Sequence, residues 1–303
     1  MKNIISCEQY TRQSLEELFR LVDDIKSNPK KYKNALDNKI VAVMFFEPST
    51  RTRMSFESAI LRVGGRIIAT ENAMVSSSTR KGETLEDTIK VLNSYADAIV
   101  MRHSDVDAAE RAASVAKVPI LNGGSGKGEH PTQALLDMYT IKEKKGKIDG
   151  IKVAILGDLI YGRTIHSLIK LLSLYDNVEI YGLSKEAFKL PEEYINILKD
   201  HNIDYKKCTS FDELPRDIDI LYHTRIQSER FEGDFGKEEY IINKEVLDKF
   251  SEDTLVMHPL PRVDEISTDI DDDPRAVYFE QAENGVYIRM GLLLQVLNKD
   301  KIE

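Results

Sequence analysis

The sequence has little cysteine: only Cys7 and Cys208 occur in 303 residues, far apart and outside any paired motif. That pattern is not typical of a disulfide framework, so a reducing, cytoplasmic location is expected. No apolar run approaches the ~20 residues that a membrane span needs. Residues 1–19 also lack the basic start, apolar stretch and cleavage site of a secretory signal. These absences argue against secretion and against a membrane partner.

Positive charge is also in deficit, because 42 lysines and arginines face 51 aspartates and glutamates, for a formal net charge of −9. This balance argues against a nucleic-acid partner. A local cluster of arginines is therefore informative, since it runs against the charge of the whole chain. The 42% hydrophobic and 31% charged residues are typical of a globular protein.

Short apolar runs alternate with amphipathic segments along the chain, which favours parallel sheets covered by helices. The predicted strands lie at 40–46, 66–70, 98–101, 118–121, 152–156, 178–181, 218–222 and 254–257. The predicted helices lie at about 54–63, 85–95, 131–143, 164–174, 192–199, 244–250 and 285–297. The expected fold is α/β, with two domains that each contain a mainly parallel sheet flanked by helices.

A possible anion site follows the first predicted strand, at Glu47–Arg53 (EPSTRTR). Pro48 ends the strand pattern, and Ser49 or Thr50 can cap the next helix. Backbone N–H groups and the dipole at a helix start attract an anion, and the guanidinium of Arg51 matches phosphate oxygens. In isolation, the same segment would also suit an ordinary helix cap with a surface arginine.

Other polar segments lie where α/β sheets bind ligands, after predicted strands. Arg102 directly follows the strand at 98–101, and His130 opens a helix after the glycine-rich loop at 122–128. A polar loop at 76–83 would usually be read as solvated. Taken one at a time, these segments also suit structural roles.

Six motifs occur together, in the order F-x-E-P-S-T-R-T-R, S-x-x-x-K-G-E, M-R-H, H-P-T-Q-A-L-L-D, G-D-L-x-Y-G-R-T-x-H-S-L and H-P-L-P-R. From about residue 40 to the final helix, the chain resembles the catalytic chains of the aspartate carbamoyltransferase family. S-T-R-T with H-P-T-Q marks the carbamoyltransferases. The resemblance implies transfer of the carbamoyl group from carbamoyl phosphate to the amine of L-aspartate, the committed step of pyrimidine biosynthesis.

The resemblance implies a carbamoyl phosphate site in the first half of the chain. The phosphate would be held by Ser49, Thr50, Arg51, Thr52 and Arg102. His130 would donate to the carbamoyl oxygen, and Gln133 would lie beside the carbamoyl amide. Ser77, Leu260 and Pro261 complete the expected set. Cationic and N–H donors suit this chemistry, because attack by an amine places negative charge on the carbamoyl oxygen.

The L-aspartate site is expected mainly in the second half. Its implied residues are Lys81, Arg102, Arg163, Arg225, Gln227 and Leu260. Arg163 and Arg225 follow predicted strands, and their two separate guanidinium groups could each bind one carboxylate of the substrate. The Leu260 carbonyl would orient the substrate amine. The expected catalytic residues are Arg51, Thr52, Lys81, Arg102 and His130.

The resemblance also carries expectations about organisation. It implies a carbamoyl phosphate-binding domain at 1–132, completed by a C-terminal helix at 285–303, and an aspartate-binding domain at 133–284. Ser77 and Lys81 would serve the neighbouring subunit of a homotrimer, and a separate regulatory chain is possible. No cofactor and no metal is expected, since the six histidines form no close metal-ligand pair.

Several alternatives fit the sequence less well. A P-loop at 122–129 lacks its first glycine and its serine or threonine, and a Rossmann motif at Gly157 lacks its second glycine. An EF-hand at 269–273 would have Pro274 in place of glycine. An ornithine carbamoyltransferase typically has cysteine where this chain has Pro259. A non-catalytic scaffold homologue is the alternative from another class.

Overall fold

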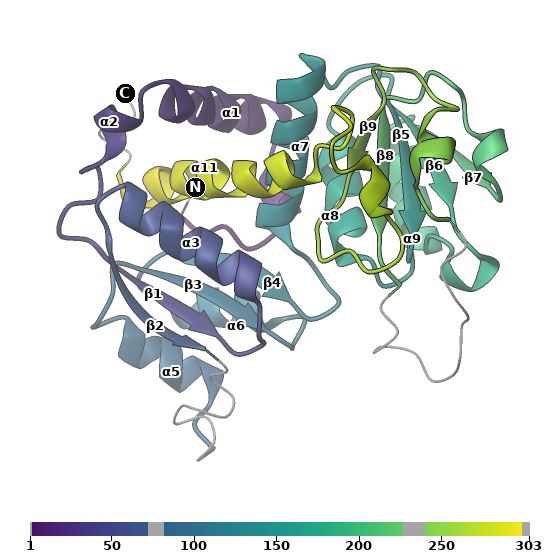
Figure 1. Cartoon of the computed structure of the whole chain (residues 1–303). Coiled ribbons are helices and arrows are strands. Elements are labelled where there is room, and N and C mark those ends of the chain that lie inside the picture. The colour runs from purple at the N-terminus through teal and green to yellow at the C-terminus, as the bar shows by residue number, and fades with distance from the viewer. Residues whose placement is uncertain (1, 72–81, 227–239, 299–303) are drawn as a thin grey trace. The chain divides into compact units, whose positions relative to one another are not determined.

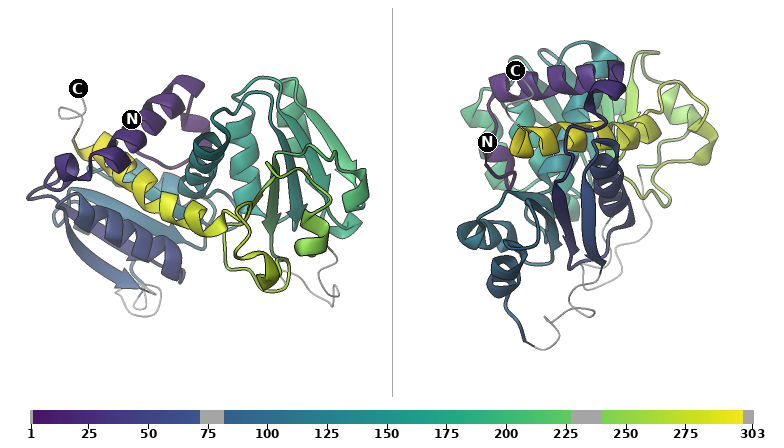
Figure 2. Two further views of the ribbon diagram at one scale, coloured as in Figure 1. Left: turned by 45° about the horizontal axis from the view of Figure 1, so that its top comes forward. Right: turned by 90° about the vertical axis from the view of Figure 1, so that its left-hand side faces the viewer.

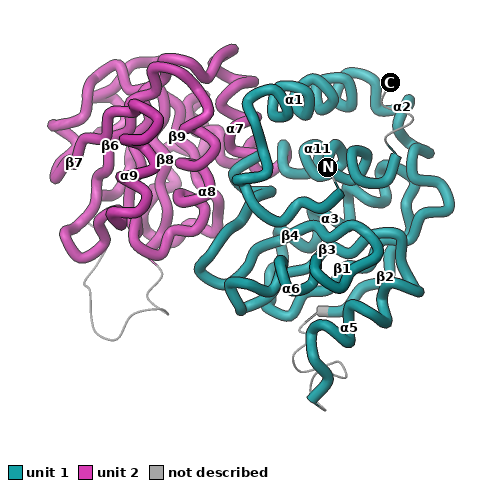
Figure 3. Tube along the Cα trace, turned by 180° about the vertical axis from the view of Figure 1, so that it is seen from behind, with its two compact units in different colours: residues 1–135, 284–303 teal, residues 136–283 magenta. Residues whose placement is uncertain are grey.

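The computed structural model describes residues 2–71, 82–226 and 240–298. The chain forms two compact units (Figure 3), unit 1 from Met1–Leu135 with Asn284–Glu303, and unit 2 from Leu136–Glu283. Each unit contains one parallel sheet covered by helices, so the predicted α/β fold is confirmed.

The sheet of unit 1 has four parallel strands in the order β2-β1-β3-β4 (Figure 1). They are β1 (Ile40–Phe45), β2 (Arg66–Glu71), β3 (Ala98–His103) and β4 (Ile120–Ser125). β1 and β3 are buried along nearly their whole length. Their apolar runs without polar alternation are what a parallel strand covered on both faces requires.

Helices cover both faces of this sheet. α5 (Leu85–Leu92) and α6 (Ala108–Val115) pack on one face, over a core that includes Met44 and Ile99. α3 (Thr50–Arg62) contacts β1 and β2, and Figure 1 shows it on the opposite face. Because α3 starts directly after β1, its first turn is fixed at the carboxyl edge of the sheet.

The C-terminal helix returns to unit 1, as predicted. α11 (Tyr278–Leu297) lies beside α1 (Arg12–Ser27) in Figures 1 and 2, next to the short α2 (Pro29–Tyr32) at the end of α1. A Cβ added at Gly291 would lie 3.0 Å from a methyl of Leu18 and 3.1 Å from a methyl of Val22. The absence of a side chain at this position therefore permits the close approach of the two helices.

The sheet of unit 2 has five parallel strands in the order β7-β6-β5-β8-β9. They are β5 (Lys152–Gly157), β6 (Glu179–Leu183), β7 (Asp204–Cys208), β8 (Ile220–Thr224) and β9 (Leu255–Met257). Its helices are α7 (Pro131–Lys145), which begins in unit 1, α8 (Arg163–Leu172), α9 (Glu192–Asp200) and α10 (Lys244–Leu247). A core of buried side chains, which includes Ala154, Leu221 and Tyr278, covers one face of the sheet.

Among the elements that differ from the sequence prediction, β7 and α11 have clear physical reasons. β7 reads DYKKC, and its lysines are exposed at the edge of the sheet, so it lacks the apolar run by which the other strands were predicted. α11 begins at Tyr278, seven residues before the predicted start at 285. The extra turns contain Glu280 and Glu283, which interrupt the apolar pattern of the helix.

Candidate functional site

In unit 1 the predicted phosphate residues meet at a topological switch point. The chain goes from β1 to β2 on one side and to β3 and β4 on the other. In open α/β sheets, ligands bind where the strand order reverses, outside the carboxyl ends of the strands. Ser49 follows β1 at this point, and Arg102 lies near the end of β3, where it pairs with Phe45.

The first turn of α3 carries most of the residues that were predicted to bind phosphate. Ser49 occupies the N-cap position with extended backbone, but in the described structure its side chain makes no capping hydrogen bond. Ser49 is therefore the N-cap residue, as the sequence predicted, but without a side-chain capping bond. Its hydroxyl is not used by the helix, which suits a role toward a ligand. Thr50 and Arg51 are exposed, whereas Thr52 is buried.

Arg102 is almost fully buried, with 8% of its surface exposed. Its Nη2 donates to Glu47 Oε1 at 3.1 Å, and its Nη1 donates to the Gly123 carbonyl at 3.4 Å. The pairing of β3 with β4 is irregular between Met101 and His103, and such a bulge redirects a side chain. The guanidinium is thus held in one orientation at the carboxyl end of its strand.

Glu47 was not among the predicted site residues. It lies in the same motif as Ser49 and Arg51, next to a predicted anion site. An acidic residue beside such a site is unfavourable unless it pairs with a cation, and this signal could have identified it as an arginine partner. The structure shows that pairing with Arg102, at 3.1 Å.

Thr52 and His130 connect α3 to the start of α7. Both side chains are buried, with exposures of 7% and 5%, and Thr52 Oγ1 lies 3.4 Å from His130 Nε2. Gln133 is one turn further into α7 and is 9% exposed. Three predicted residues are therefore buried at the starts of α3 and α7, and two of them, Thr52 and His130, are in contact.

Arg289 on α11 supports the same region and was not predicted. Its Nη1 donates to Ser55 Oγ at 2.8 Å and its Nη2 donates to Thr132 Oγ1 at 3.2 Å. Its guanidinium also lies 4.9 Å from the ring centre of Phe56. Arg289 thus joins α3 to the first turn of α7. No local pattern could have found it, because its partners are 234 and 157 residues away.

In unit 2 the predicted aspartate residues also lie at a switch point, here between β5 and β8. Arg163 is the first residue of α8, after the loop that follows β5, and is 9% exposed. Arg225 directly follows β8 and is half-buried, with its Nη1 3.5 Å from the Ile226 carbonyl. Leu260 and Pro261 follow β9, the next strand along. Three site segments therefore follow three neighbouring strands.

The loop before Arg163 has a defined construction. Gly157 has a φ of +95°, and a Cβ there would lie 2.0 Å from the Thr224 carbonyl oxygen, so only glycine fits against β8. Asp158 Oδ1 accepts the Tyr161 N–H at 2.8 Å. These contacts determine where the loop ends and α8 begins, and hence where Arg163 is positioned.

His166, one turn after Arg163, supports this loop from behind. Its Nε2 lies 2.9 Å from the Leu159 carbonyl, and its ring stacks on Tyr194 at 3.9 Å between centres. Burial lowers the pKa of His166 to about 4, so the imidazole is neutral at pH 7. The sequence alone predicts no functional role for this histidine.

Three predicted residues lie outside the described parts of the chain: Ser77, Lys81 and Gln227. The remaining predictions fall into two groups, each at a switch point of its own unit. Unit 1 carries Ser49, Thr50, Arg51, Thr52, Arg102, His130 and Gln133, whereas unit 2 carries Arg163, Arg225, Leu260 and Pro261.

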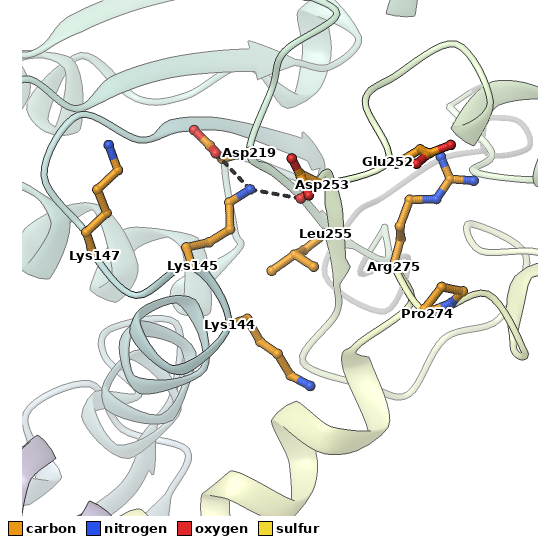
Figure 4. Close-up of a pocket in the computed structure, with 9 residues that line it drawn as sticks. All are labelled: Lys144, Lys145, Lys147, Asp219, Glu252, Asp253, Leu255, Pro274 and Arg275. Carbon is orange, nitrogen blue, oxygen red and sulfur yellow. Dashed lines mark hydrogen bonds and ion pairs between the residues drawn. The ribbon is translucent and has the colours of Figure 1, made fainter.

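A cavity of about 410 Å³ lies at the opposite edge of the unit 2 sheet (Figure 4). Asp219 precedes β8 and Leu255 begins β9, so this is the amino edge. Lys145 Nζ bonds to Asp219 at 2.8 Å and to the Asp253 carbonyl at 2.8 Å. These charges compensate one another, and none of the predicted site residues lines the cavity.

Residues 2–71, 82–226 and 240–298 contain no group of three or more His, Cys, Asp and Glu side chains that could hold a metal ion. Among the helices in these same ranges, none is both long and apolar enough to cross a membrane.

Two family models together match most of the chain. The one described as "Aspartate/ornithine carbamoyltransferase, carbamoyl-P binding domain" matches residues 2–143. The one described as "Aspartate/ornithine carbamoyltransferase, Asp/Orn binding domain" matches residues 149–296.

Individual relatives agree. The chain is 46% identical to the aspartate carbamoyltransferase catalytic subunit of Clostridium perfringens, over 98% of both chains. The aspartate transcarbamoylase catalytic subunit of M. Jannaschii aligns with a TM-score of 0.92 and 44% identity over 100% of both chains. The Trypanosoma cruzi aspartate transcarbamoylase, in complex with carbamoyl phosphate and aspartate, aligns with a TM-score of 0.90 and 39% identity, covering 98% of this chain and 97% of that one. This chain belongs to the aspartate/ornithine carbamoyltransferase family.

Proposed function

We propose that the protein is an aspartate carbamoyltransferase, which transfers the carbamoyl group of carbamoyl phosphate to the amine of L-aspartate and releases phosphate. The observation that carries this proposal is the position of the two arginine-bearing sites, each at the switch point of a parallel sheet. One substrate carries a phosphate and the other carries two carboxylates, so the reaction needs anion sites of both kinds. The relatives named above carry the same activity in their names.

The phosphate of carbamoyl phosphate is bound at the start of α3 in this proposal. The N–H groups of the first turn, the hydroxyls of Ser49 and Thr50, and the guanidinium of Arg51 surround it. Arg102 approaches from β3 with its orientation held by Glu47. These groups also neutralise the charge that develops as the phosphate departs.

The carbamoyl group lies toward His130, Thr52 and Gln133. When the neutral amine attacks the carbamoyl carbon, negative charge accumulates on the carbamoyl oxygen. An N–H of His130 that points at this oxygen would stabilise the tetrahedral intermediate. No protein nucleophile takes part: the C–N bond forms, the C–O bond to phosphate breaks, and phosphate can accept the amine proton. Positioning and electrostatics account for the rate.

L-Aspartate is bound by the unit 2 residues in this proposal. Arg163 and Arg225 follow the adjacent strands β5 and β8, about 4.8 Å apart in a sheet, and each can pair with one carboxylate. Gln227 and Lys81 add polar contacts. The Leu260 carbonyl accepts from the amine and directs its lone pair at the carbamoyl carbon. Pro261 borders the carbamoyl phosphate.

The proposal includes an organisation. Residues 1–132 with 285–303 bind carbamoyl phosphate, and residues 133–284 bind aspartate. Ser77 and Lys81 serve the site of a neighbouring subunit, so the active form is a homotrimer, and a regulatory chain can join it. Cys7 and Cys208 are both buried and are not joined in a disulfide, which suits a reducing cytoplasm, where the enzyme would supply de novo pyrimidine biosynthesis.

A product assay with carbamoyl phosphate and either L-aspartate or L-ornithine tests the acceptor. We expect N-carbamoyl-L-aspartate from aspartate and no citrulline from ornithine, because two arginines suit an anionic acceptor. Formation of citrulline would leave the family assignment intact but would overturn L-aspartate as the proposed acceptor. Absence of product from both would overturn the proposed activity of the isolated chain.

Arg51→Ala tests the phosphate site. We expect a loss of activity of at least about a hundredfold, because one preorganised cationic donor is removed. Arg62→Ala is the matched control, since Arg62 lies in the last turn of the same helix and makes a solvent-exposed hydrogen bond to Ser58. Equal activity of the two variants would contradict the assignment.

A further inference from the structure

A buried histidine lies behind the loop that carries Leu260. His258 directly follows β9 and is 2% exposed. Its Nδ1 accepts the backbone N–H of Leu260 at 2.8 Å, and its Nε2 lies 2.8 Å from Glu265 Oε1. The imidazole therefore makes contacts with both ends of the loop between residues 258 and 265.

These contacts define the protonation state of His258. A backbone N–H can only donate, so the Nδ1 that it contacts must carry a lone pair. Nε2 then carries the proton and donates it to the Glu265 carboxylate. His258 is therefore neutral in the Nε2–H tautomer, and a second proton on Nδ1 would break the bond to Leu260.

Glu265 closes the loop on itself. Its Oε2 accepts the backbone N–H groups of Val263 and Asp264, both at 3.1 Å, while its Oε1 faces His258. Burial opposes ionisation, but the hydrogen bond from His258 and those from the backbone N–H groups outweigh it and hold the pKa of Glu265 below its usual range. The carboxylate is charged at pH 7 and provides a fixed acceptor for the His258 ring.

The other end of the network is anchored in the helices of unit 2. Gln281 Oε1 on α11 accepts the backbone N–H of His258 at 2.9 Å. The amide of Gln281 donates to Asp137 Oδ1 on α7 at 2.6 Å, and Tyr222 on β8 donates to Asp137 Oδ2 at 2.8 Å. All of these side chains are buried. The position of His258 is thus determined from three other elements.

The Leu260 backbone needs such support. Leu260 has a φ of +54°, in the left-handed region that side-chain-bearing residues rarely adopt. Residues held in this region persist where their surroundings fix them, often at functional sites. The bond from the Leu260 N–H to His258 Nδ1 holds the peptide unit immediately before this residue.

We propose that His258, held as the neutral Nε2–H tautomer by Glu265, is a positioning residue that fixes the Leu260 backbone for binding of the L-aspartate amine. This inference rests on the proposed function, because Leu260 contacts substrate only there. His258 itself does not touch the reacting atoms. Its effect is therefore expected on aspartate and not on carbamoyl phosphate.

Two substitutions separate the two ring nitrogens. In His258→Asn, the amide oxygen can occupy the Nδ1 position and accept from Leu260, but nothing reaches Glu265. In His258→Gln, the amide N–H can reach Glu265, but nothing accepts from Leu260. His201→Gln is the control, because His201 is exposed at the end of α9.

We expect His258→Gln to raise the KM for aspartate about tenfold, the effect of losing one well-placed hydrogen bond. The KM for carbamoyl phosphate should change less than about twofold, and His258→Asn should keep the aspartate KM within about threefold of wild type. Equal effects of the two variants, or equal effects on both substrates, would overturn the inference. Wild-type enzyme without N-carbamoyl-aspartate product would instead refute the proposed function.

A measurement on the wild-type enzyme covers the case in which neither variant folds. With ¹⁵N-labelled histidine, six imidazoles contribute signals. At pH 7 the His258 ring should show a protonated Nε2 and an unprotonated Nδ1. A protonated Nδ1 would overturn the inference, whatever the variants do.

Discussion

The two units present their site residues in different ways. In unit 1 the site side chains bond to one another or to direct partners, as Arg102 does with Glu47 and Thr52 with His130. In unit 2 the site loops are held from behind by buried histidines, His166 for the loop before Arg163 and His258 for Leu260. Unit 1 therefore fixes side chains, and unit 2 fixes backbone.

This difference suits the two substrates of the proposed reaction. A phosphate is bound well by a rigid set of donors, because the leaving group needs charge neutralisation in one fixed geometry. An amine that must be aimed needs an acceptor whose direction is defined, and a backbone carbonyl in a fixed loop provides one. Substitutions in unit 1 should consequently affect turnover, whereas those in unit 2 should affect aspartate affinity.

The largest effect is expected for Arg102→Ala in unit 1. Removal of the guanidinium takes away a phosphate partner and leaves Glu47 with its main cation missing, so kcat should fall about a thousandfold. Steady-state kinetics with both substrates would measure this. Arg111→Ala is the control, since Arg111 pairs with the surface residue Glu86. A raised KM with an unchanged kcat would contradict the expectation that unit 1 variants affect turnover and unit 2 variants affect aspartate affinity.

Arg225→Ala tests unit 2 in the same way. Loss of the guanidinium that pairs with one substrate carboxylate should raise the KM for aspartate about a hundredfold, because a charge-assisted pair is worth about 3 kcal/mol. The KM for carbamoyl phosphate should stay within about twofold of wild type. Arg216→Ala provides an exposed arginine in the same unit. A matching rise for both substrates would contradict separate sites.

Arg289→Met addresses the support of the unit 1 site. The loss of two charge-assisted hydrogen bonds to Ser55 and Thr132 should lower the free energy of unfolding by about 3 kcal/mol and reduce kcat about tenfold. Urea denaturation and initial rates would measure the two effects. Unchanged kcat with reduced stability would show that Arg289 only holds the fold.

A smaller effect is expected from His166 on the pH dependence of stability. Because burial lowers its pKa to about 4, the folded state favours the neutral ring, and unfolding takes up a proton below the ordinary pKa near 6.5. This contribution is complete above pH ~6.5 and is lost as the pH falls toward 4, by about 2 kcal/mol at pH 5. The free energy of unfolding can be measured in urea at pH 7.5 and pH 5 for the wild type and for His166→Gln. It should fall more between these pH values in the wild type than in the variant. An equal fall in both would exclude His166 as a source of the pH dependence.

The sequence predicted most of the fold because buried parallel strands are continuous apolar runs, as in Ile40–Phe45. β7 was not predicted, because an exposed edge strand has no such apolar run. Site residues were predicted where a local motif contained them, as with Ser49 and Arg51. The contacts that support the sites were not predicted, because Arg289 and Ser55, or Gln281 and Asp137, meet only through the fold.

The C-terminal helix also affects the order in which the units can form during synthesis. α11 supplies Arg289 to Ser55 and Thr132, yet it follows every other described element in the chain. Domains generally fold as their residues leave the ribosome, amino-terminal part first. Here unit 1 stays without its last helix until unit 2 has been translated. The downstream unit can therefore be complete first, and an early stop that removes only α11 would affect a site whose motifs lie more than 150 residues upstream.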